Sequence, residues 1–249
     1  MVTDSLGTIR IAHLYPRQMS IYGDTGNIRA LAQRALWRGY AVDVIPVDIG
    51  PCPDMESVDL VVIGGGEDRA QRAIAEDLRS LKGPALRSAA EGGLPILAIC
   101  GGYQLLGAFY RGADGSTLMG IGLLPVETVH AGEAAPRCVG SIVVRWGSET
   151  LVGFENHGGR TYLTGGQPLG RVQIGFGNNG SDGSEGCVAG SVIGTYLHGA
   201  LLPKNPHLAD HLLSLAVRRR GLPPLPPLDD TIETIAHRAA VRRAQARKR

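Results

Sequence analysis

A cysteine lies at the junction of a predicted strand and a predicted helix. Residues 95–107 read PILAICGGYQLLG, so a short apolar strand runs into Cys100 and two glycines open the next helix. Sharp turns of this kind hold the nucleophile of many α/β enzymes above the sheet. The positive end of the helix would stabilise a thiolate, and the Gly101 amide would point towards a developing oxyanion. The segment predicts a cysteine nucleophile, with a buried structural cysteine as the alternative.

A second glycine cluster follows another apolar strand. Residues 61–69 read VVIGGGEDR, so the glycines lie where open α/β sheets bind their ligands, at the carboxyl end of a strand. The run lacks both the Lys-Ser/Thr of a P-loop and GxGxxG spacing, which disfavours phosphate binding. We interpret Gly65 and Gly66 as contributors to an oxyanion hole opposite Cys100. A plain strand-to-helix turn is the alternative.

A histidine completes the candidate site. Residues 192–199 read VIGTYLHG, which places His198 just after a strand, as Cys100 is placed. A cysteine nucleophile needs a base within hydrogen-bond reach, and histidine is the usual one. His157, in the polar segment FENHGGR, is a rival candidate. His207, His211 and His237 fall in helical stretches and are interpreted as surface residues.

These residues require a framework of alternating strands and helices. The pattern predicts strands over 8–14, 41–47, 59–63 and 95–99 and helices over 24–38 and 67–81. Continuous apolar strands in a βαβα order indicate an α/β fold, with an open, mostly parallel sheet flanked by helices.

The second half of the chain has a different pattern. Strands are predicted near Leu123 and over 139–144, 172–176 and 192–197, and we expect them to form an antiparallel extension of the same sheet. Two closing helices are predicted over 207–220 and 229–246. The proline-rich segment between them, GLPPLPPL, is interpreted as a stiff connector.

Composition excludes several classes of protein. Glycine accounts for 36 of 249 residues, about twice the usual share, but it has no collagen period, and 43% hydrophobic residues exclude a disordered chain. The four cysteines form no CxxC pair, which argues against a zinc site and a disulfide scaffold and favours a reduced, cytoplasmic compartment. No secretory signal and no membrane span are predicted. Nine Lys or Arg against three Asp or Glu follow residue 217, which we interpret as a solvated basic tail and not a nucleic-acid site.

The order and spacing of these motifs resemble the class I glutamine amidotransferases, which have a flavodoxin-like fold. The elbow ICGGYQLLG, the GGG turn and the late GTYLHG are most similar to the cobyric acid synthase-like (CobB/CobQ) branch. Within that branch, LYPRQMSIYGDTGN at 14–27, GGGEDRAQ at 64–71 and GFENHGG at 153–159 resemble the glutaminase subunits of lipid II isoglutaminyl synthases. The resemblance implies an amidotransferase domain over 1–206. The C-terminal helices and basic tail, 207–249, would pack on that domain or extend from it.

The resemblance also implies a mechanism and a partner. Cys100 would attack the side-chain amide of L-glutamine, with His198 as base and then as acid, and Gly65, Gly66 and Gly101 would hold the oxyanion. Ammonia would pass to a MurT-like Mur ligase subunit in a heterodimer. There, ATP-activated D-glutamate of lipid II becomes D-isoglutamine during peptidoglycan synthesis. The resemblance implies no cofactor or metal in this chain, and ATP on the partner.

Two substrate-binding residues are assigned by the same resemblance. Arg137, just before a predicted strand, would bind the α-carboxylate of glutamine, and Gln104 in the elbow motif is the second candidate. For Arg137 the alternative is an ordinary surface arginine.

One departure concerns the third catalytic residue. Many class I enzymes follow the histidine with Pro-Glu, whereas His198 is followed by Gly199 and Ala200, and the next carboxylate is Asp210. The acid is therefore absent, comes from elsewhere in the chain, or is supplied by the partner, which would make activity depend on assembly.

Other functions remain open at this point. They are a glutaminase subunit of another ATP-dependent amidotransferase, a cysteine hydrolase acting on peptides, and a non-catalytic scaffold. The joint presence of Cys100 and His198 argues against the scaffold.

Overall fold

A computed structural model describes residues 5–21, 23–132 and 134–246 of the chain. Features predicted on residues 1–4, 22, 133 and 247–249 lie outside the described residues. They include Tyr22 in one of the family motifs and the last three residues of the basic tail.

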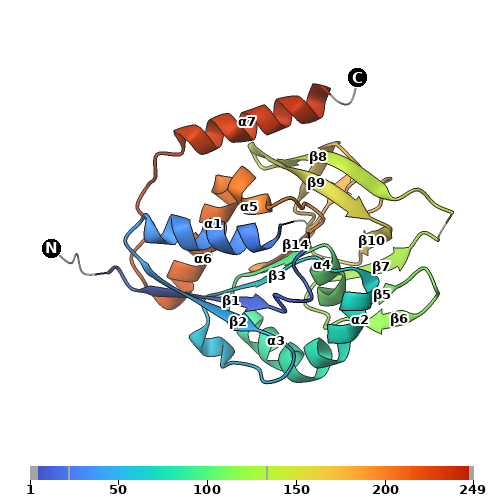
Figure 1. Ribbon diagram of the computed structural model, residues 1–249, viewed down its shortest axis with the longest axis horizontal. Coiled ribbons are helices and arrows are strands. Elements are labelled where there is room, and N and C mark those ends of the chain that lie inside the picture. Colours follow the sequence, from blue (N-terminus) through green and yellow to red (C-terminus); the bar gives the residue numbers. More distant parts are fainter. Residues whose placement is uncertain (1–4, 22, 133, 247–249) are drawn as a thin grey trace.

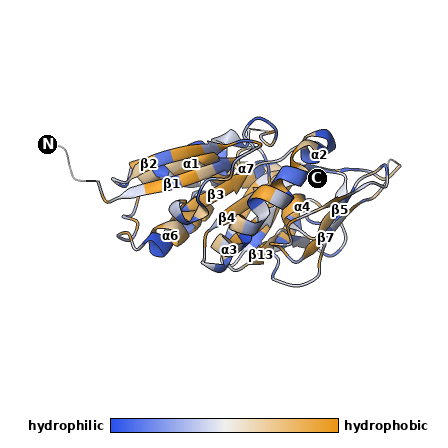
Figure 2. Ribbon diagram, turned by 90° about the horizontal axis from the view of Figure 1, so that it is seen from below, coloured by the Kyte–Doolittle hydropathy of each residue, from blue (hydrophilic) through white to orange (hydrophobic). Residues whose placement is uncertain are grey.

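The described chain is built on a six-stranded sheet in the order β13-β14-β4-β3-β1-β2, parallel except for β13 (Figure 1). The strands are β1 (Thr8–Leu14), β2 (Ala41–Val47), β3 (Leu60–Ile63), β4 (Ile96–Ile99), β13 (Cys187–Ala189) and β14 (Val192–Thr195). The central strands β3 and β4 are apolar and buried at every position, as helices on both faces of a parallel sheet require. Figure 2 shows the hydrophobic colouring along β1, β3 and β4. This sheet confirms the predicted α/β class.

Helices cover both faces of the sheet. Figure 1 shows α1, α5 and α6 on one face and α2 and α3 on the other. The helices are α1 (Thr25–Leu36), α2 (Asp68–Asp77), α3 (Gly83–Glu91), α4 (Gly101–Leu106), α5 (Leu201–Lys204), α6 (Pro206–Arg220) and α7 (Thr231–Ala246). A 3₁₀ turn (Met55–Ser57) precedes β3, and a π-helical turn (Leu78–Lys82) joins α2 to α3.

Helix α3 was not predicted from the sequence. The pair Gly83-Pro84 is typical of a turn, but here Pro84 lies in the first turn of α3, where its missing N–H leaves no hydrogen bond unmade. The predicted helix over 67–81 is α-helical only to Asp77 and continues as the π-helical turn.

The antiparallel half differs from the prediction. Of the strands that follow β4, β14 joins the main sheet as a parallel strand and β13 extends it as an antiparallel one, whereas the others form two separate four-stranded sheets, β10-β7-β5-β6 and β12-β11-β8-β9. Their strands are β5 (Phe109–Arg111), β6 (Thr117–Met119), β7 (Val126–His130), β8 (Cys138–Trp146), β9 (Glu149–His157), β10 (Gly159–Leu163), β11 (Gly170–Ile174) and β12 (Ser184–Glu185). Alternating hydrophobicity predicts a strand but not its partner, because pairing is a long-range property.

The strand predicted near Leu123 is absent. Residues 123–125 form a bend between β6 and β7, and Leu124 is buried there next to Gly194. The hydrophobic pattern at this point therefore reflects packing on the edge of the core.

The C-terminal helices are joined to the body by charge and by apolar contact. The buried guanidinium of Arg34 on α1 bonds Asp210 on α6 and Asp230 before α7, each at 2.7 Å. Helix α7 packs beside β8 and β9 through a small apolar cluster that includes Val143, Val152 and Ala244. Within the described residues, no helix is both long enough and apolar enough to cross a membrane.

Candidate active site

Cys100 occupies the sharp turn between β4 and α4. Its backbone has φ 50° and ψ −105°, a region that side-chain-bearing residues rarely adopt. Such strain persists only where the surrounding structure fixes it, and it is typical of a nucleophile held above a sheet. The side chain is 6% exposed. The structure therefore supports the predicted elbow.

The two glycine clusters pack against each other beside the thiol. A Cβ atom on Gly101 would lie 2.7 Å from the Gly66 carbonyl oxygen, and one on Gly102 would lie 2.8 Å from that of Gly64. The Gly102 amide donates to the Gly64 carbonyl oxygen at 3.2 Å. These positions need glycine because two backbones approach here with no room for side chains.

His198 is buried and lies next to Cys100. Backbone hydrogen bonds with Phe154 of β9, 2.7 Å and 3.2 Å long, fix its position. Its ring lies next to the Cys100 side chain and faces Asp24, whose Oδ1 lies 3.5 Å from His198 Nδ1. Burial lowers the pKa of His198, but the charge on Cys100 and the Asp24 carboxylate outweigh burial and raise it to about 10. The His198 ring next to the Cys100 sulfur is therefore held in its charged form at neutral pH.

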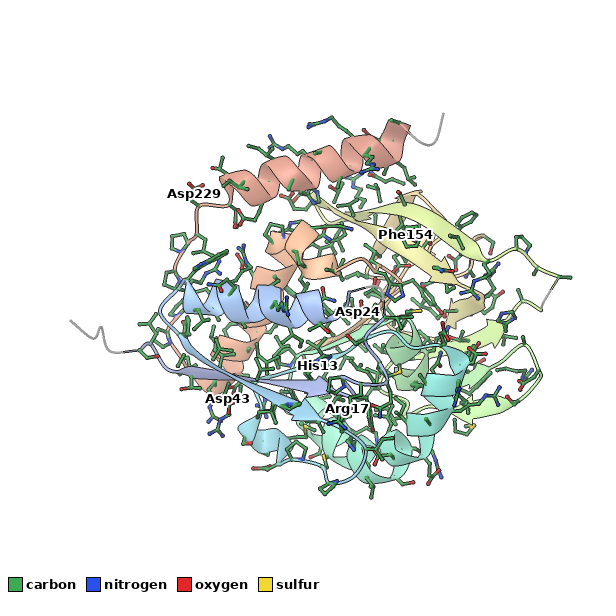
Figure 3. All side chains as sticks on the ribbon, in the orientation of Figure 1. His13, Arg17, Asp24, Asp43, Phe154 and Asp229 are labelled. Carbon is green, nitrogen blue, oxygen red and sulfur yellow. The ribbon has the colours of Figure 1, made fainter. Side chains whose placement is uncertain are left out.

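Asp24 was not among the predicted site residues. It lies where the loop after β1 enters α1 (Figure 3), and its side chain makes no bond to the start of that helix. Its Oδ2 instead accepts from the Gly65 amide at 2.6 Å, so one carboxylate contacts both the histidine and the glycine turn. An aspartate just before a helix is normally interpreted as an N-cap, which hides this signal in the sequence. The third catalytic residue was expected to be absent, to come from elsewhere in the chain, or to be supplied by the partner. The position of Asp24 favours an acid from elsewhere in the same chain.

Replacing Asp24 with asparagine is expected to lower kcat/KM for glutamine hydrolysis roughly 10²-fold. Loss of the carboxylate charge also lowers the pKa of His198, because that charge raises it. The alkaline limb of the pH–rate profile should therefore move to lower pH. Asp43→Asn is the matched control, because Asp43 is an exposed residue on β2 (Figure 3). An unchanged profile in Asp24→Asn would contradict this role.

The occupied amide of Gly65 changes the predicted oxyanion hole. Because the Gly65 N–H donates to Asp24, it is not available to a bound oxyanion. A Cβ atom on Gly65 would lie 2.5 Å from His198 Cε1, so the glycine is needed for close contact with the histidine. Gly66 and Gly101 remain the amides placed next to Cys100.

A cavity of about 490 Å³ opens beside Cys100, and Gln104, Arg137 and His157 also line it. The rival histidine His157 stacks on Tyr196 at 3.7 Å between ring centroids, and its Nδ1 is hydrogen-bonded to the Gly159 carbonyl oxygen. The ring that interacts with Cys100 is that of His198. The structure thus places His157 in the cavity wall.

Arg137 also lies in the cavity wall, as the prediction requires. Its Nε donates to Asn156 Oδ1 at 3.0 Å and its Nη2 to the Asn156 carbonyl oxygen at 3.2 Å, and both bonds orient the guanidinium. The structure therefore brings this residue and Cys100 to one cavity.

Gln104 has a different environment from the one predicted. Its amide nitrogen donates to the Tyr196 hydroxyl at 3.1 Å, and its oxygen accepts from Gln71 at 2.9 Å. Gln71 also donates to the Gly66 carbonyl oxygen at 3.1 Å. The two glutamines thus support the glycine turn, and direct contact of Gln104 with substrate stays a prediction. Nothing in the sequence distinguishes Gln71 from other polar residues of its helix.

No three His, Cys, Asp or Glu side chains are placed to hold a metal ion in the part of the chain that the structure describes.

Comparison with known proteins gives consistent results. The profile of the CobB/CobQ-like glutamine amidotransferase domain matches residues 10–206. The chain is 41% identical over 243 residues to the lipid II isoglutaminyl synthase (glutamine-hydrolyzing) subunit GatD of Staphylococcus aureus (strain N315), covering 97% of this chain and 98% of that protein. The Streptococcus pneumoniae (strain ATCC BAA-255 / R6) subunit of the same name is 39% identical, covering 85% and 82%. A probable cobyric acid synthase of Methanothermobacter thermautotrophicus is 32% identical, but the chain covers only 40% of it.

Solved structures share the fold at low sequence identity. A crystal structure of a glutamine amidotransferase superposes with a TM-score of 0.57 at 17% identity, covering 82% of this chain and 98% of that one. PurLQS from Thermotoga maritima gives a TM-score of 0.55, also at 17% identity, over 85% and 96%.

Proposed function

Since the chain belongs to the CobB/CobQ-like glutamine amidotransferase family, we propose that it is the glutamine-hydrolysing subunit of a lipid II isoglutaminyl synthase. The likeness to the two GatD subunits extends over most of the chain, including the region beyond the amidotransferase domain. One structural observation carries the catalytic part of the proposal. The strained Cys100 elbow faces a buried histidine whose charged form is favoured by its neighbours.

The reaction begins with attack of the Cys100 thiolate on the carbonyl carbon of the glutamine side-chain amide. We assign the binding of the resulting oxyanion to the amides of Gly66 and Gly101, because these glycines lie next to Cys100 and the Gly65 amide is already bonded to Asp24. The His198 imidazolium gives its proton to the leaving nitrogen, and ammonia departs from a glutamyl thioester. A water molecule then attacks the thioester carbon and transfers a proton to His198. Collapse releases glutamate and returns the thiolate.

Ammonia passes to the partner, a MurT-like Mur ligase subunit in a heterodimer. That subunit binds ATP, activates the D-glutamate carboxyl of the lipid II stem peptide, and joins ammonia to it to give D-isoglutamine. The reaction belongs to peptidoglycan synthesis in the cytoplasm and contributes to cell-wall formation and cell shape. This chain needs no cofactor or metal of its own, since its nucleophile, base and oxyanion donors are protein groups. Because Asp24 supplies the acid in cis, we expect the chain alone to hydrolyse glutamine.

Co-expression with a Mur ligase-like partner tests the proposal. The complex should release glutamate from glutamine and convert lipid II to its isoglutaminyl form when ATP is present, as followed by mass spectrometry. With Cys100→Ala, glutamine should no longer support amidation, whereas added ammonium chloride should restore it. That rescue separates loss of glutaminase activity from loss of the ligase. Glutamine-dependent amidation by the Cys100→Ala complex would refute the proposal.

A further inference from the structure

The cavity beside Cys100 carries charges of both signs. Arg137 lies in its wall, and the carboxylates of Glu67 and Asp68 also line it. A volume of about 490 Å³ is within the usual range for small-molecule sites. Free glutamine has an α-carboxylate and an α-ammonium group besides its reacting amide. Arg137 is assigned to the α-carboxylate, whereas the α-ammonium group has no assigned partner.

Asp68 is the carboxylate that the structure holds in place. It is the first residue of α2 and is half-buried. The Tyr110 hydroxyl donates to its Oδ1 at 3.0 Å. Tyr110 is 3% exposed, and its pKa is raised by burial, then by Asp68, and further by the negative charge on Cys100. The phenol therefore stays protonated and donates to Asp68, and it lines the same cavity as Cys100.

Glu67 differs from its neighbour in ways that matter for recognition. It is exposed, and its side chain makes no hydrogen bond to the start of α2, which it precedes. An unsupported carboxylate at the rim can turn into solvent and gains little from an ion pair. A half-buried carboxylate fixed by a tyrosine has a defined direction and forms a stronger, charge-assisted bond to an ammonium group.

We propose that Asp68, fixed by Tyr110, binds the α-ammonium group of free L-glutamine while Arg137 binds the α-carboxylate. This inference rests on the proposed glutaminase function and names the residue that makes the site selective for a free amino acid. A glutamine residue within a peptide has no α-ammonium group and no α-carboxylate. The charged pair therefore disfavours peptides, because a peptide glutamine offers neither side chain an opposite charge.

Two truncated substrates separate the contributions. Glutaramate lacks only the α-amino group of glutamine, and γ-aminobutyramide lacks only the α-carboxylate. With the complex containing the full chain, we expect Asp68→Asn to lower kcat/KM for glutamine about 10²-fold, mostly through KM, and to change that for glutaramate less than about 3-fold. Arg137→Met should show the converse pattern, losing activity towards glutamine but not towards γ-aminobutyramide.

Glu67→Gln is the matched control, because it removes the neighbouring carboxylate of the same cavity and should leave both rates within about 3-fold. Tyr110→Phe keeps the ring and removes the donor, so it should weaken glutamine binding less than Asp68→Asn does. Thermal midpoints of all variants establish that they fold, and Asp68→Ser is a second substitution with a smaller side chain.

The outcomes separate this inference from the proposed function. Equal losses on glutamine and glutaramate in both Asp68 variants, or no loss on either, would overturn the role of Asp68 and leave the glutaminase function intact. Wild-type complex that neither hydrolyses glutamine nor is labelled at Cys100 by diazo-oxonorleucine would overturn both.

Discussion

Replacing Cys100 with serine is expected to lower kcat/KM for glutamine hydrolysis by at least about 10⁴-fold. A hydroxyl at this position is a much weaker acid and a poorer nucleophile than a thiol. The elbow should persist, because its strain comes from packing of the glycine clusters, which serine does not alter. Glutamate release measured by a coupled assay provides the rate.

Covalent labelling gives a second readout of the same prediction. Diazo-oxonorleucine, a reactive glutamine analogue, should modify wild-type protein once, at Cys100, and should leave Cys100→Ser unmodified. The other thiols are poor competitors because burial raises the pKa of Cys52, Cys138 and Cys187, the last to about 11. Cys52→Ser is the matched control and should retain full activity and labelling. Labelling at a different cysteine, or glutaminase activity in Cys100→Ser, would disprove the assignment of the nucleophile.

Replacing His198 with asparagine is expected to cost about 10³-fold or more in kcat/KM, because one side chain both stabilises the thiolate and protonates the leaving nitrogen. The double variant Cys100→Ser/His198→Asn should be little worse than either single variant, since the two residues act as a unit. Additive losses would mean that they act independently. His157→Asn serves as the comparison, because its ring lines the cavity but is bonded to backbone and stacked on Tyr196.

The charge state of His198 gives this prediction a pH dependence. Its pKa of about 10 lies above the usual 6.5, so the ring stays protonated at neutral pH and loses its proton only as the pH approaches 10. Activity should therefore fall on the alkaline side near pH 10. Nitrogen NMR of the ring checks this directly, with His207 and His211 as internal references, since burial lowers the pKa of both. A His198 signal that titrates between pH 6 and 7 would contradict the raised pKa.

Much of the framework follows from local sequence. Strands β1 and β2 have the predicted bounds, 8–14 and 41–47, because short apolar runs flanked by turn residues define strands locally. The same local signals place Cys100 and His198 at the ends of β4 and β14, which are neighbours in the sheet. In a parallel sheet the carboxyl ends of neighbouring strands meet at one edge. The sequence could thus predict the pairing of cysteine and histidine.

Other features depend on contacts between segments that are distant in the chain. The division of the later strands into separate sheets depends on which strands pair, and a period of two does not encode that choice. The π-helical turn is tied to distant segments, because Lys82 within it donates to the Gly50 carbonyl oxygen at 3.0 Å and Asp77 just before it accepts from the Tyr15 hydroxyl at 2.7 Å.

The sequence by itself determined the fold class and predicted Cys100 and His198 as nucleophile and base, because strand ends, glycine turns and residue types are local signals. Only the tertiary structure decided what surrounds them. Asp24 resembles a helix cap and Asp68 a solvent-facing carboxylate until folding brings the first next to His198 and the second next to Tyr110. The direction of a side chain and the distance to its partner depend on packing across the whole domain, so these roles emerge only in three dimensions.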